Sequence, residues 1–248
     1  MKNILMLIPA YNEEDNIGEL LSKITEQNIE ETMDVLVIDD GSRDRTAQIV
    51  RDSGYKVISQ IFNMGYGAAL QTGYKYAVSR GYEYLIQLDA DGQHDLKNVE
   101  LICKKLGCGA GSGDEYPDIV IGSRFLEGSQ SFAIPPLKRL AIRFFRSIIR
   151  KNTGCTLTDP TSGLQGLSRS AFSFYAGYRN FDLKYPDMNM AIQMLLLRYK
   201  IEEFPAIMHE RTSGVSMHTG LLKVGRYMLL MMLSSLNAYL RYRRRDKQ

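Results

Sequence analysis

Two aspartates, Asp89 and Asp91, stand two residues apart directly after the apolar run at 84–88. Alternate side chains share one face of an extended chain, so both carboxylates can point at one cation. A few hard oxygen ligands, with positions left open for phosphate oxygens, suit Mg²⁺ or Mn²⁺. Two acids in a turn are often only solvated. Their place at the end of an expected strand favours a divalent metal site instead.

A second acidic pair, Asp39 and Asp40, follows the apolar run at 34–38. A helix begins soon after it, and Ser42 or Asp44 is expected to cap that helix. Two adjacent acids cannot both act as caps. We therefore expect one of them to face the ligand crevice, where it can accept a hydrogen bond from a base or a ribose.

Asn63, Gly65 and Gly67 form a glycine-rich segment that permits close approach of the backbone to a ligand. The segment resembles a dinucleotide fingerprint only in part, because Leu70 stands where a third glycine or alanine is required. A nicotinamide-dependent dehydrogenase is therefore disfavoured.

The elements that must position these residues alternate along the first half of the chain. Apolar runs at 3–8, 34–38, 57–61, 84–88 and 119–121 predict buried strands, with helices expected at 16–26 and 67–79. This pattern predicts an α/β fold with a doubly wound, mostly parallel sheet, whose ligands bind beyond the carboxyl ends of its strands. The polar clusters should therefore meet in one crevice. The second half is less regular, with a polar turn at 158–163, a helix at 187–199 and a strand at 201–207.

Positive charge is concentrated in two places, although the net charge is only +3. Residues 138–151 carry six basic residues and no acid, and residues 241–248 carry five basic residues and one acid. The segment at 136–151 places Leu137, Leu140, Phe144, Ile148 and Ile149 near one stripe, as in a helix that lies at a membrane interface. A surface helix packed on the core is the alternative.

The segment at 220–245 is apolar, but only about 14 uncharged residues separate Arg226 from Arg241. A bilayer span needs about 20. We expect this segment to lie on an anionic membrane surface or to pair with another subunit. Basic residues interleaved with long aliphatic ones suit lipid better than nucleic acid, so no nucleic-acid partner is predicted.

The three cysteines, Cys103, Cys108 and Cys155, show no paired spacing and are expected to be core residues. The amino-terminal stretch turns polar too early for a signal peptide. Both features favour a reducing cytoplasm.

Taken together, the motifs resemble family 2 glycosyltransferases, in the branch that contains dolichyl-phosphate mannose synthase and bacterial polyprenyl-phosphate glycosyltransferases. The resemblance covers roughly residues 3–215. The motifs occur in consistent order: IPAYNEEDNI at 8–17, VLVIDDGSRDRT at 35–46, NMGYGAAL at 63–70, LDADGQHD at 88–95, IGSRF at 121–125 and DPTSGLQGLSR at 159–169.

The resemblance implies a GT-A fold, an inverting reaction and the following roles. A nucleotide-sugar pocket would be formed by Pro9, Tyr11, Glu13, Asp39, Asp40, Gly67 and Asp89. The metal on the donor diphosphate would be held by Asp89, Asp91 and Gln93. Arg124 would face the phosphates or the acceptor, and Arg211 would close over the donor. Met217 stands where the family often has a lysine, which removes one phosphate contact.

The expected activity is transfer of a sugar, from a UDP-sugar rather than a GDP-sugar, to a polyprenyl phosphate at the cytoplasmic membrane face. Transfer to a hydroxyl of a lipid-linked saccharide is the alternative, and only that reaction needs a general base. Asp187 is the candidate base, unless it merely caps the following helix, and Asp159 is a second candidate. A catalytically inactive regulatory subunit is disfavoured because the acids and arginines are all present.

We expect residues 1–219 to form the glycosyltransferase domain, including the basic segment at 136–151. Residues 220–248 are expected to form the membrane-surface or oligomer contact. The protein is accordingly predicted to be cytoplasmic and bound peripherally to the inner face of the cell membrane.

Overall fold

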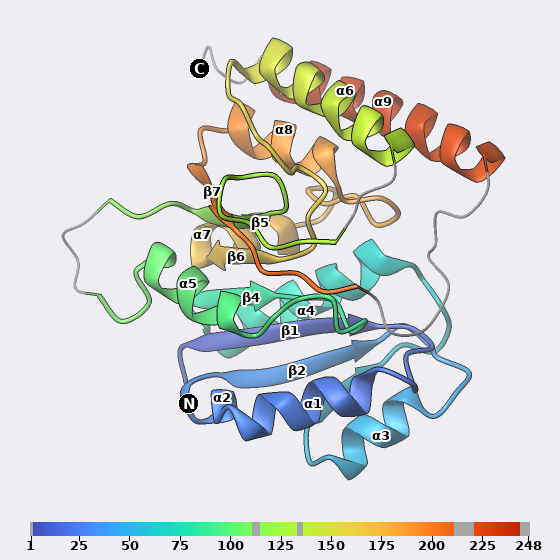
Figure 1. Ribbon diagram of the computed structural model, residues 1–248, viewed down its shortest axis with the longest axis vertical. Helices are drawn as coiled ribbons and strands as arrows, with labels where there is room; N and C mark the ends of the chain where they lie inside the picture. Colours follow the sequence, from blue (N-terminus) through green and yellow to red (C-terminus); the bar gives the residue numbers. More distant parts are fainter. Residues whose placement is uncertain (1, 111–114, 133–135, 211–220, 244–248) are drawn as a thin grey trace.

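The computed structural model describes residues 2–110, 115–132, 136–210 and 221–243, and these residues form a sheet of seven strands (Figure 1). The strands are β1 Ile4–Ala10, β2 Asp34–Asp39, β3 Lys56–Ser59, β4 Tyr84–Gln87, β5 Ile119–Ser123, β6 Gln165–Ser168 and β7 Ile201–Pro205. Their order is β3-β2-β1-β4-β6-β5-β7. β6 runs antiparallel to β4 and β5, and the other pairs are parallel. The expected mostly parallel α/β sheet is therefore confirmed.

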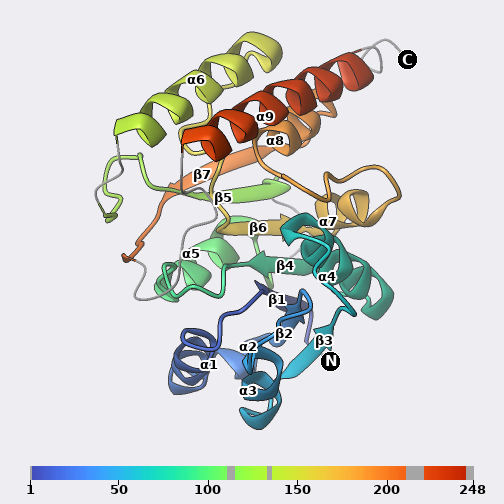
Figure 2. The same ribbon diagram turned by 90° about the vertical axis from the view of Figure 1, so that its right-hand side faces the viewer.

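Helices connect these strands and cover both faces of the sheet (Figures 1 and 2). They are α1 Ile17–Glu26, α2 Ile29–Thr32, α3 Thr46–Asp52, α4 Tyr66–Arg80, α5 Lys97–Leu106, α6 Pro136–Thr153, α7 Arg169–Ala176, α8 Met188–Leu196 and α9 Leu221–Tyr242.

Strand β1 is buried on both faces, which explains why its sequence is an unbroken apolar run. Its alternate residues Met6 and Ile8 belong to a core cluster with α1 and α5, whereas Leu5 and Leu7 belong to a cluster with α4, α7 and α8. A strand buried on both faces has no polar side to alternate with the apolar one. The sheet is thus the middle layer of three.

A further layer lies outside α8 and consists of α6 and α9 (Figure 2). Phe145 and Ile149 of α6 and Met231 of α9 pack against Met188 and Ile192 of α8. Both long carboxy-terminal helices are therefore attached to the body of the molecule through α8.

The outer face of α6 differs in part from the predicted stripe. Leu140 and Phe144 are 63% and 42% exposed, as an interfacial helix requires, but Ile149 is fully buried. The helix packs on the core through a second stripe that the sequence analysis did not separate from the first. The alternative, a surface helix packed on the core, is therefore confirmed, and the membrane contact of the exposed stripe stays a prediction.

Some elements were not predicted. β6 and α2 have four residues each and α7 has eight, which is too short for a clear periodic signal, whereas α5 does carry helical spacing at Val99, Ile102 and Leu106 that was not recognised. The expectation for the cysteines is corrected for Cys155, which is exposed, whereas Cys103 and Cys108 are half-buried and pack against the core. Within the part of the chain that the structure describes, no helix is long and apolar enough to cross a membrane.

Candidate active site

The loops that follow β1 and β2 are joined by hydrogen bonds at the carboxyl edge of the sheet. The amide of Asn12 donates to Ser42 Oγ (2.9 Å), and the amide of Glu13 donates to Thr46 Oγ1 (2.8 Å). Ser42 therefore holds the neighbouring loop and does not cap α3. Asp44 instead accepts from the amide of Thr46 at the start of that helix (3.0 Å). The two polar clusters meet, as predicted.

Pro9, Tyr11 and Glu13 mark the exit of β1 toward the crevice. Pro9 is buried in the strand beside Ile38. Tyr11 is 41% exposed at the end of the strand, so its ring is available to a ligand. Glu13 Oε2 accepts from Asn16 Nδ2 (2.6 Å), which draws this carboxylate toward the start of α1.

Asp39 and Asp40 are both buried and are held by backbone amides. Asp39 Oδ1 accepts from the amide of Ser42 (3.0 Å). Asp40 accepts from the amides of Met64 and Gly65, each at 2.8 Å. Burial raises the pKa of Asp40, although these two amides act in the opposite direction. Asp40 therefore fixes the loop ahead of α4.

Gly67 permits a close approach, but its neighbour is protein. A Cβ atom at Gly67 would lie 2.7 Å from the carbonyl oxygen of Leu183 and would also meet the carbonyl oxygen of Asp182. Any larger residue would therefore push the loop at 182–187 away from the first turn of α4. This glycine brings a late loop against the amino-terminal half of the crevice.

Asp89 follows β4 at the carboxyl edge of the sheet, and both of its oxygens have protein partners. Tyr66 donates its hydroxyl to Oδ1 (2.9 Å), and His94 Nε2 lies 3.3 Å from Oδ2. A Cβ atom at Gly163 would lie 2.5 Å from Oδ2, so only glycine allows that loop to approach. Burial acts to raise the pKa of Asp89, but His94, Tyr66 and the charge of Arg124 outweigh it and lower the pKa. Asp89 is therefore held ionised.

The predicted donor set for a divalent cation is Asp89, Asp91 and Gln93. Asp91 is half-buried and its Oδ1 accepts from the amide of Gln93 (3.1 Å), so the turn keeps this carboxylate close to the strand end. Gln93 Nε2 donates to the carbonyl of His209 (3.4 Å). Among the described residues, no three His, Cys, Asp or Glu side chains form a metal cluster. One or two carboxylates with substrate phosphates completing the shell is the usual arrangement for Mg²⁺, and this set fits it.

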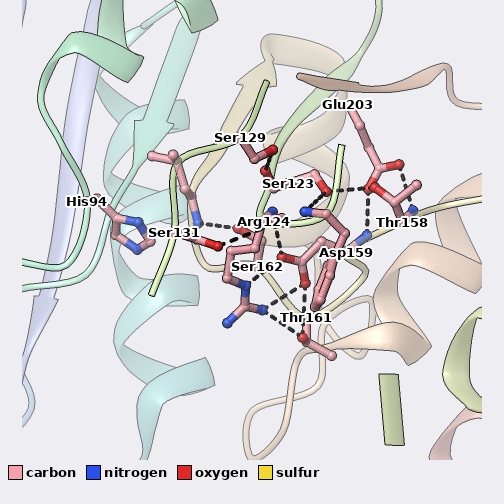
Figure 3. Close-up of polar contacts among 12 residues, drawn as sticks. His94, Ser123, Arg124, Ser129, Ser131, Thr158, Asp159, Thr161, Ser162 and Glu203 are labelled. Carbon is pink, nitrogen blue, oxygen red and sulfur yellow. Dashed lines mark hydrogen bonds and ion pairs between the residues drawn. The ribbon is translucent and has the colours of Figure 1, made fainter. Parts of the chain in front are cut away.

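Arg124 is bound by Asp159 in a buried, two-point ion pair (Figure 3). Its Nε lies 2.6 Å from Asp159 Oδ2 and its Nη2 lies 2.7 Å from Oδ1. Burial acts to lower the pKa of Arg124, but Asp159 and the charges of Asp89 and Asp187 raise it. Asp159 is fully buried and already paired, so its reading as a base is corrected. It is the counterion of Arg124.

Glu203 of β7 lies on the side of Thr158 and Asp159 that faces away from Arg124 (Figure 3). Its carboxylate accepts from the amides of Thr158 and Asp159, both at 2.7 Å. Burial raises the pKa of Glu203 although these amides act to lower it. The loop that carries Asp159 is thereby fixed to the far edge of the sheet.

Asp187 occupies the N-cap position of α8, but its side chain makes no capping hydrogen bond. Its charge contributes, after burial and Asp89, to raising the pKa of the Tyr66 phenol. Asp187 also lines a small cavity together with Gln87, the last residue of β4 before Asp89. Arg211, the expected late arginine, lies outside the described residues.

Several residues of the site were not predicted. Tyr66 and His94 both lie within quoted motifs, NMGYG and DGQHD, and their polar rings beside an acidic strand end were the available signal. Glu203 gave no signal, because a single acid in a strand is not distinguishable from a solvated one before the strand order is known.

Comparison with known proteins places these motifs in a family. Residues 6–175 match the sequence profile described as Glycosyl transferase family 2. An uncharacterized protein of Methanocaldococcus jannaschii is 33% identical over 197 residues, which cover 79% of this chain and 76% of the relative. A UDP-N-acetylglucosamine–dolichyl-phosphate N-acetylglucosaminyltransferase of Methanococcus voltae is 29% identical over 68% of this chain and 71% of the relative. A dolichyl-phosphate beta-glucosyltransferase of Trichomonas vaginalis is 32% identical over 66% of this chain but only 51% of its own length.

Solved structures give the fold. Glucosyl-3-phosphoglycerate synthase from Mycobacterium tuberculosis, in complex with Mn²⁺, UDP-glucose and phosphoglyceric acid, superposes with a TM-score of 0.66 at 20% identity. The superposition covers 96% of this chain and 80% of the other. The seven-stranded, mostly parallel sheet thus matches the GT-A fold. With the family profile covering more than half of the sequence and the acidic strand ends gathered in one crevice, this chain belongs to glycosyl transferase family 2.

Proposed function

We propose that this protein transfers a sugar, with inversion, from a nucleoside diphosphate donor to a polyprenyl phosphate at the cytoplasmic face of a membrane. UDP is the favoured nucleotide, since a relative named above takes UDP-N-acetylglucosamine. Relatives that carry sugars to dolichyl phosphate support the acceptor class.

The observation that carries the proposal is the position of α6. On its inner side, Arg146 Nε donates to the carbonyl of Thr158 (2.6 Å), in the loop of the Arg124–Asp159 pair. On its outer side, Leu140 and Phe144 are exposed, and each directly follows an exposed arginine, Arg139 and Arg143. One helix therefore joins the crevice to a face on which long apolar and basic side chains alternate, as lipid with an anionic headgroup requires.

Charge explains the chemistry that this crevice can perform. Departure of a nucleoside diphosphate builds negative charge on its leaving oxygen, and Mg²⁺ or Mn²⁺ held by Asp89, Asp91 and Gln93 would stabilise that charge. Arg124, kept protonated and oriented by Asp159, presents a fixed positive charge beside Asp89. A phosphate acceptor is already ionised, so this route needs no general base.

The direct test is incubation of purified protein and membranes with a panel of radiolabelled sugar nucleotides, followed by lipid extraction. We expect label in the lipid phase, released by mild acid because a sugar phosphate ester is acid-labile. Label that stays in the lipid after mild acid would overturn the phosphate acceptor.

A second candidate function, transfer to a hydroxyl of a lipid-linked saccharide, is favoured by one observation: Asp187 lines the same cavity as Gln87 of the strand that leads to Asp89. For a phosphate acceptor, Asp187→Asn should keep kcat/KM within about tenfold. For a hydroxyl acceptor, the loss should be the ~10²–10⁴-fold that a positioned base supplies. Folding of the variant is checked by circular dichroism.

The membrane contact is tested separately. Replacing Arg243 and the two arginines that follow it, which lie outside the described residues, with serine should weaken binding to anionic vesicles about a hundredfold, at about 1 kcal/mol per basic residue. Lys23, Arg51 and Lys75 are exposed on α1, α3 and α4, and their triple serine variant is the matched control. If the wild type ignores anionic vesicles but self-associates, this surface is a subunit contact.

A further inference from the structure

The loop at 182–187 forms one wall of the crevice and ends at Asp187. Its backbone rests on the first turn of α4, where Gly67 leaves room for it. Pro186 and Asp187 also line a small cavity of about 20 Å³, together with Gln87 of the strand that leads to Asp89. The position of this loop therefore sets the shape of the crevice opposite the donor loops.

Asp182 organises the loop from its first position. Its Oδ1 accepts from the amides of Lys184 (2.9 Å) and Tyr185 (3.1 Å). Its Oδ2 accepts from Asn189 Nδ2 (2.8 Å) and Ser234 Oγ (2.9 Å). One carboxylate thus joins the loop to α8 and to α9.

Asn189 closes the arrangement at the other end of the loop. It is buried, its Oδ1 accepts from the amide of Asp187 (2.9 Å), and its Nδ2 also donates to Ser234 Oγ (2.7 Å). We call Asp182, Asn189 and Ser234 the Asp182 clip. The clip holds both ends of the loop, and Ser234 is its member from α9.

Helix α9 has a second face that the clip does not use. Leu233, Leu236 and Leu240, at helical spacing, are 55%, 53% and 60% exposed. The helix therefore connects an outer apolar surface to the wall of the crevice through one hydroxyl.

We infer that Ser234 and Asn189 are positioning residues: through the Asp182 clip, α9 fixes the loop at 182–187 and with it the acceptor side of the crevice. The acceptor assignment rests on the proposed function, whereas the tether itself does not. The donor loops at 11–14 and 42–46 are held by their own hydrogen bonds and have no contact with the clip among those described. The loop at 182–187 does meet the predicted donor pocket at Gly67, through backbone atoms. Loosening the clip should therefore weaken the acceptor step much more than donor binding.

The chain offers a matched pair of variants for the test. Ser234→Ala removes the hydroxyl that bonds to Asp182 and Asn189. Ser235→Ala, one residue further along α9, removes a buried hydroxyl with no hydrogen-bond partner among the described residues. Ser234→Thr keeps the hydroxyl and should rescue the loss.

Hydrogen exchange measures the tether without any activity. We expect Ser234→Ala to speed exchange of the amides of Lys184, Tyr185 and Asp187 about three- to tenfold, because local opening becomes easier. Ser235→Ala and Ser234→Thr should leave these amides within twofold of the wild type, a factor of two being about the spread of a silent change. Unchanged exchange in Ser234→Ala would overturn the tether.

Kinetics with the labelled donor and a short-chain polyprenyl phosphate then test the consequence. We expect Ser234→Ala to lower kcat/KM for the acceptor about tenfold, with the donor KM within about twofold, since misplacement by up to 1 Å costs ten- to a hundredfold. Faster exchange with unchanged acceptor kinetics, or an equal loss for donor and acceptor, would overturn the positioning role. If the wild type transfers no sugar to this lipid, the proposed function fails, and the exchange result still decides the tether.

Discussion

The two halves of the crevice hold their functional side chains in different ways. In the amino-terminal half, the two acids at the end of β2 are fixed by backbone amides, as Asp40 is by Met64 and Gly65. In the carboxy-terminal half, side chains hold one another across separate elements, as in the Arg124–Asp159 pair and the bond from Asn189 to Asp182.

The difference shows which positions follow from the fold alone. Parallel strands end at one edge of the sheet, so acids placed at those ends meet whatever their exact partners are. Strand β6 is antiparallel to β4 and β5, so strand direction alone does not bring the loops around it to this edge of the sheet. Those loops are held there by specific side-chain pairs. The direction of the strands therefore brings the acids of the first half together, whereas the second half depends on specific partners such as Arg124 and Asp159.

The largest expected effect concerns Asp91, which belongs to the chemistry of the first half and contributes little to its packing. Asp91→Asn should lower kcat/KM by about two to three orders of magnitude, because metal stabilisation of the leaving group contributes several kcal/mol. The free energy of unfolding should stay within about 0.5 kcal/mol, as for a surface substitution. Activity assays with and without EDTA, alongside urea unfolding, make the comparison.

Activity that is undiminished in EDTA would remove the metal from the mechanism. A large fall in the free energy of unfolding would instead show that Asp91 is a structural acid like Asp40. The first half would then have no acid that serves the reaction without also stabilising the fold.

The second prediction compares one ion pair with one backbone-held acid. Arg124→Ala leaves Asp159 buried without its counterion, so the free energy of unfolding should fall by about 3–5 kcal/mol. Asp40→Asn keeps one acceptor oxygen and should cost about 1–3 kcal/mol. Urea unfolding of both variants measures the two costs.

The double variant Arg124→Met, Asp159→Leu should recover much of the stability without recovering activity, because it removes the buried charge together with its partner. If Arg124→Ala costs no more than Asp40→Asn, the two halves do not differ in the way described above.

Much of the fold was predictable from the sequence. Unbroken apolar runs followed by polar clusters identified β1, β2 and β4 and the edge of the sheet at which those clusters meet. The carboxylates of Asp39, Asp40, Asp89 and Asp91 lie at that edge, as expected. Helical spacing also identified α1, α4 and α8.

The remaining features depend on pairing that a sequence does not display. Asp159 carries the signals of both a base and a turn, and only its contact with Arg124 shows that it is a counterion. β6 has four residues and contains a glycine, too little for a periodic signal. Ser234 sits in an apolar helix, where a serine has no predicted role until the helix is seen against Asp182.

The smallest expected effect is the pH dependence that Glu203 contributes to the second half. Its pKa in the folded state is raised above the ordinary value of 4.5 by burial. A raised acid pKa means that the folded state binds the proton more tightly than the unfolded chain does. The stability from this group is therefore fully present below pH 4.5 and is lost as the pH rises through the folded pKa.

Glu203→Gln removes this titration while keeping one acceptor oxygen for the amides of Thr158 and Asp159. The variant should be less stable by about 0.5–1.5 kcal/mol, the net contribution of one hydrogen bond. Because the wild type alone loses stability as the pH rises, the gap between the two proteins should narrow from pH 4.5 upward. Urea unfolding of both proteins from pH 4.5 to about 8 measures the gap, and all other titrating groups cancel in the difference. A gap that stays constant or widens with pH would mean that burial does not disfavour the ionised carboxylate of Glu203. The position of the loop that carries Asp159 would then depend less on Glu203 than its two hydrogen bonds imply.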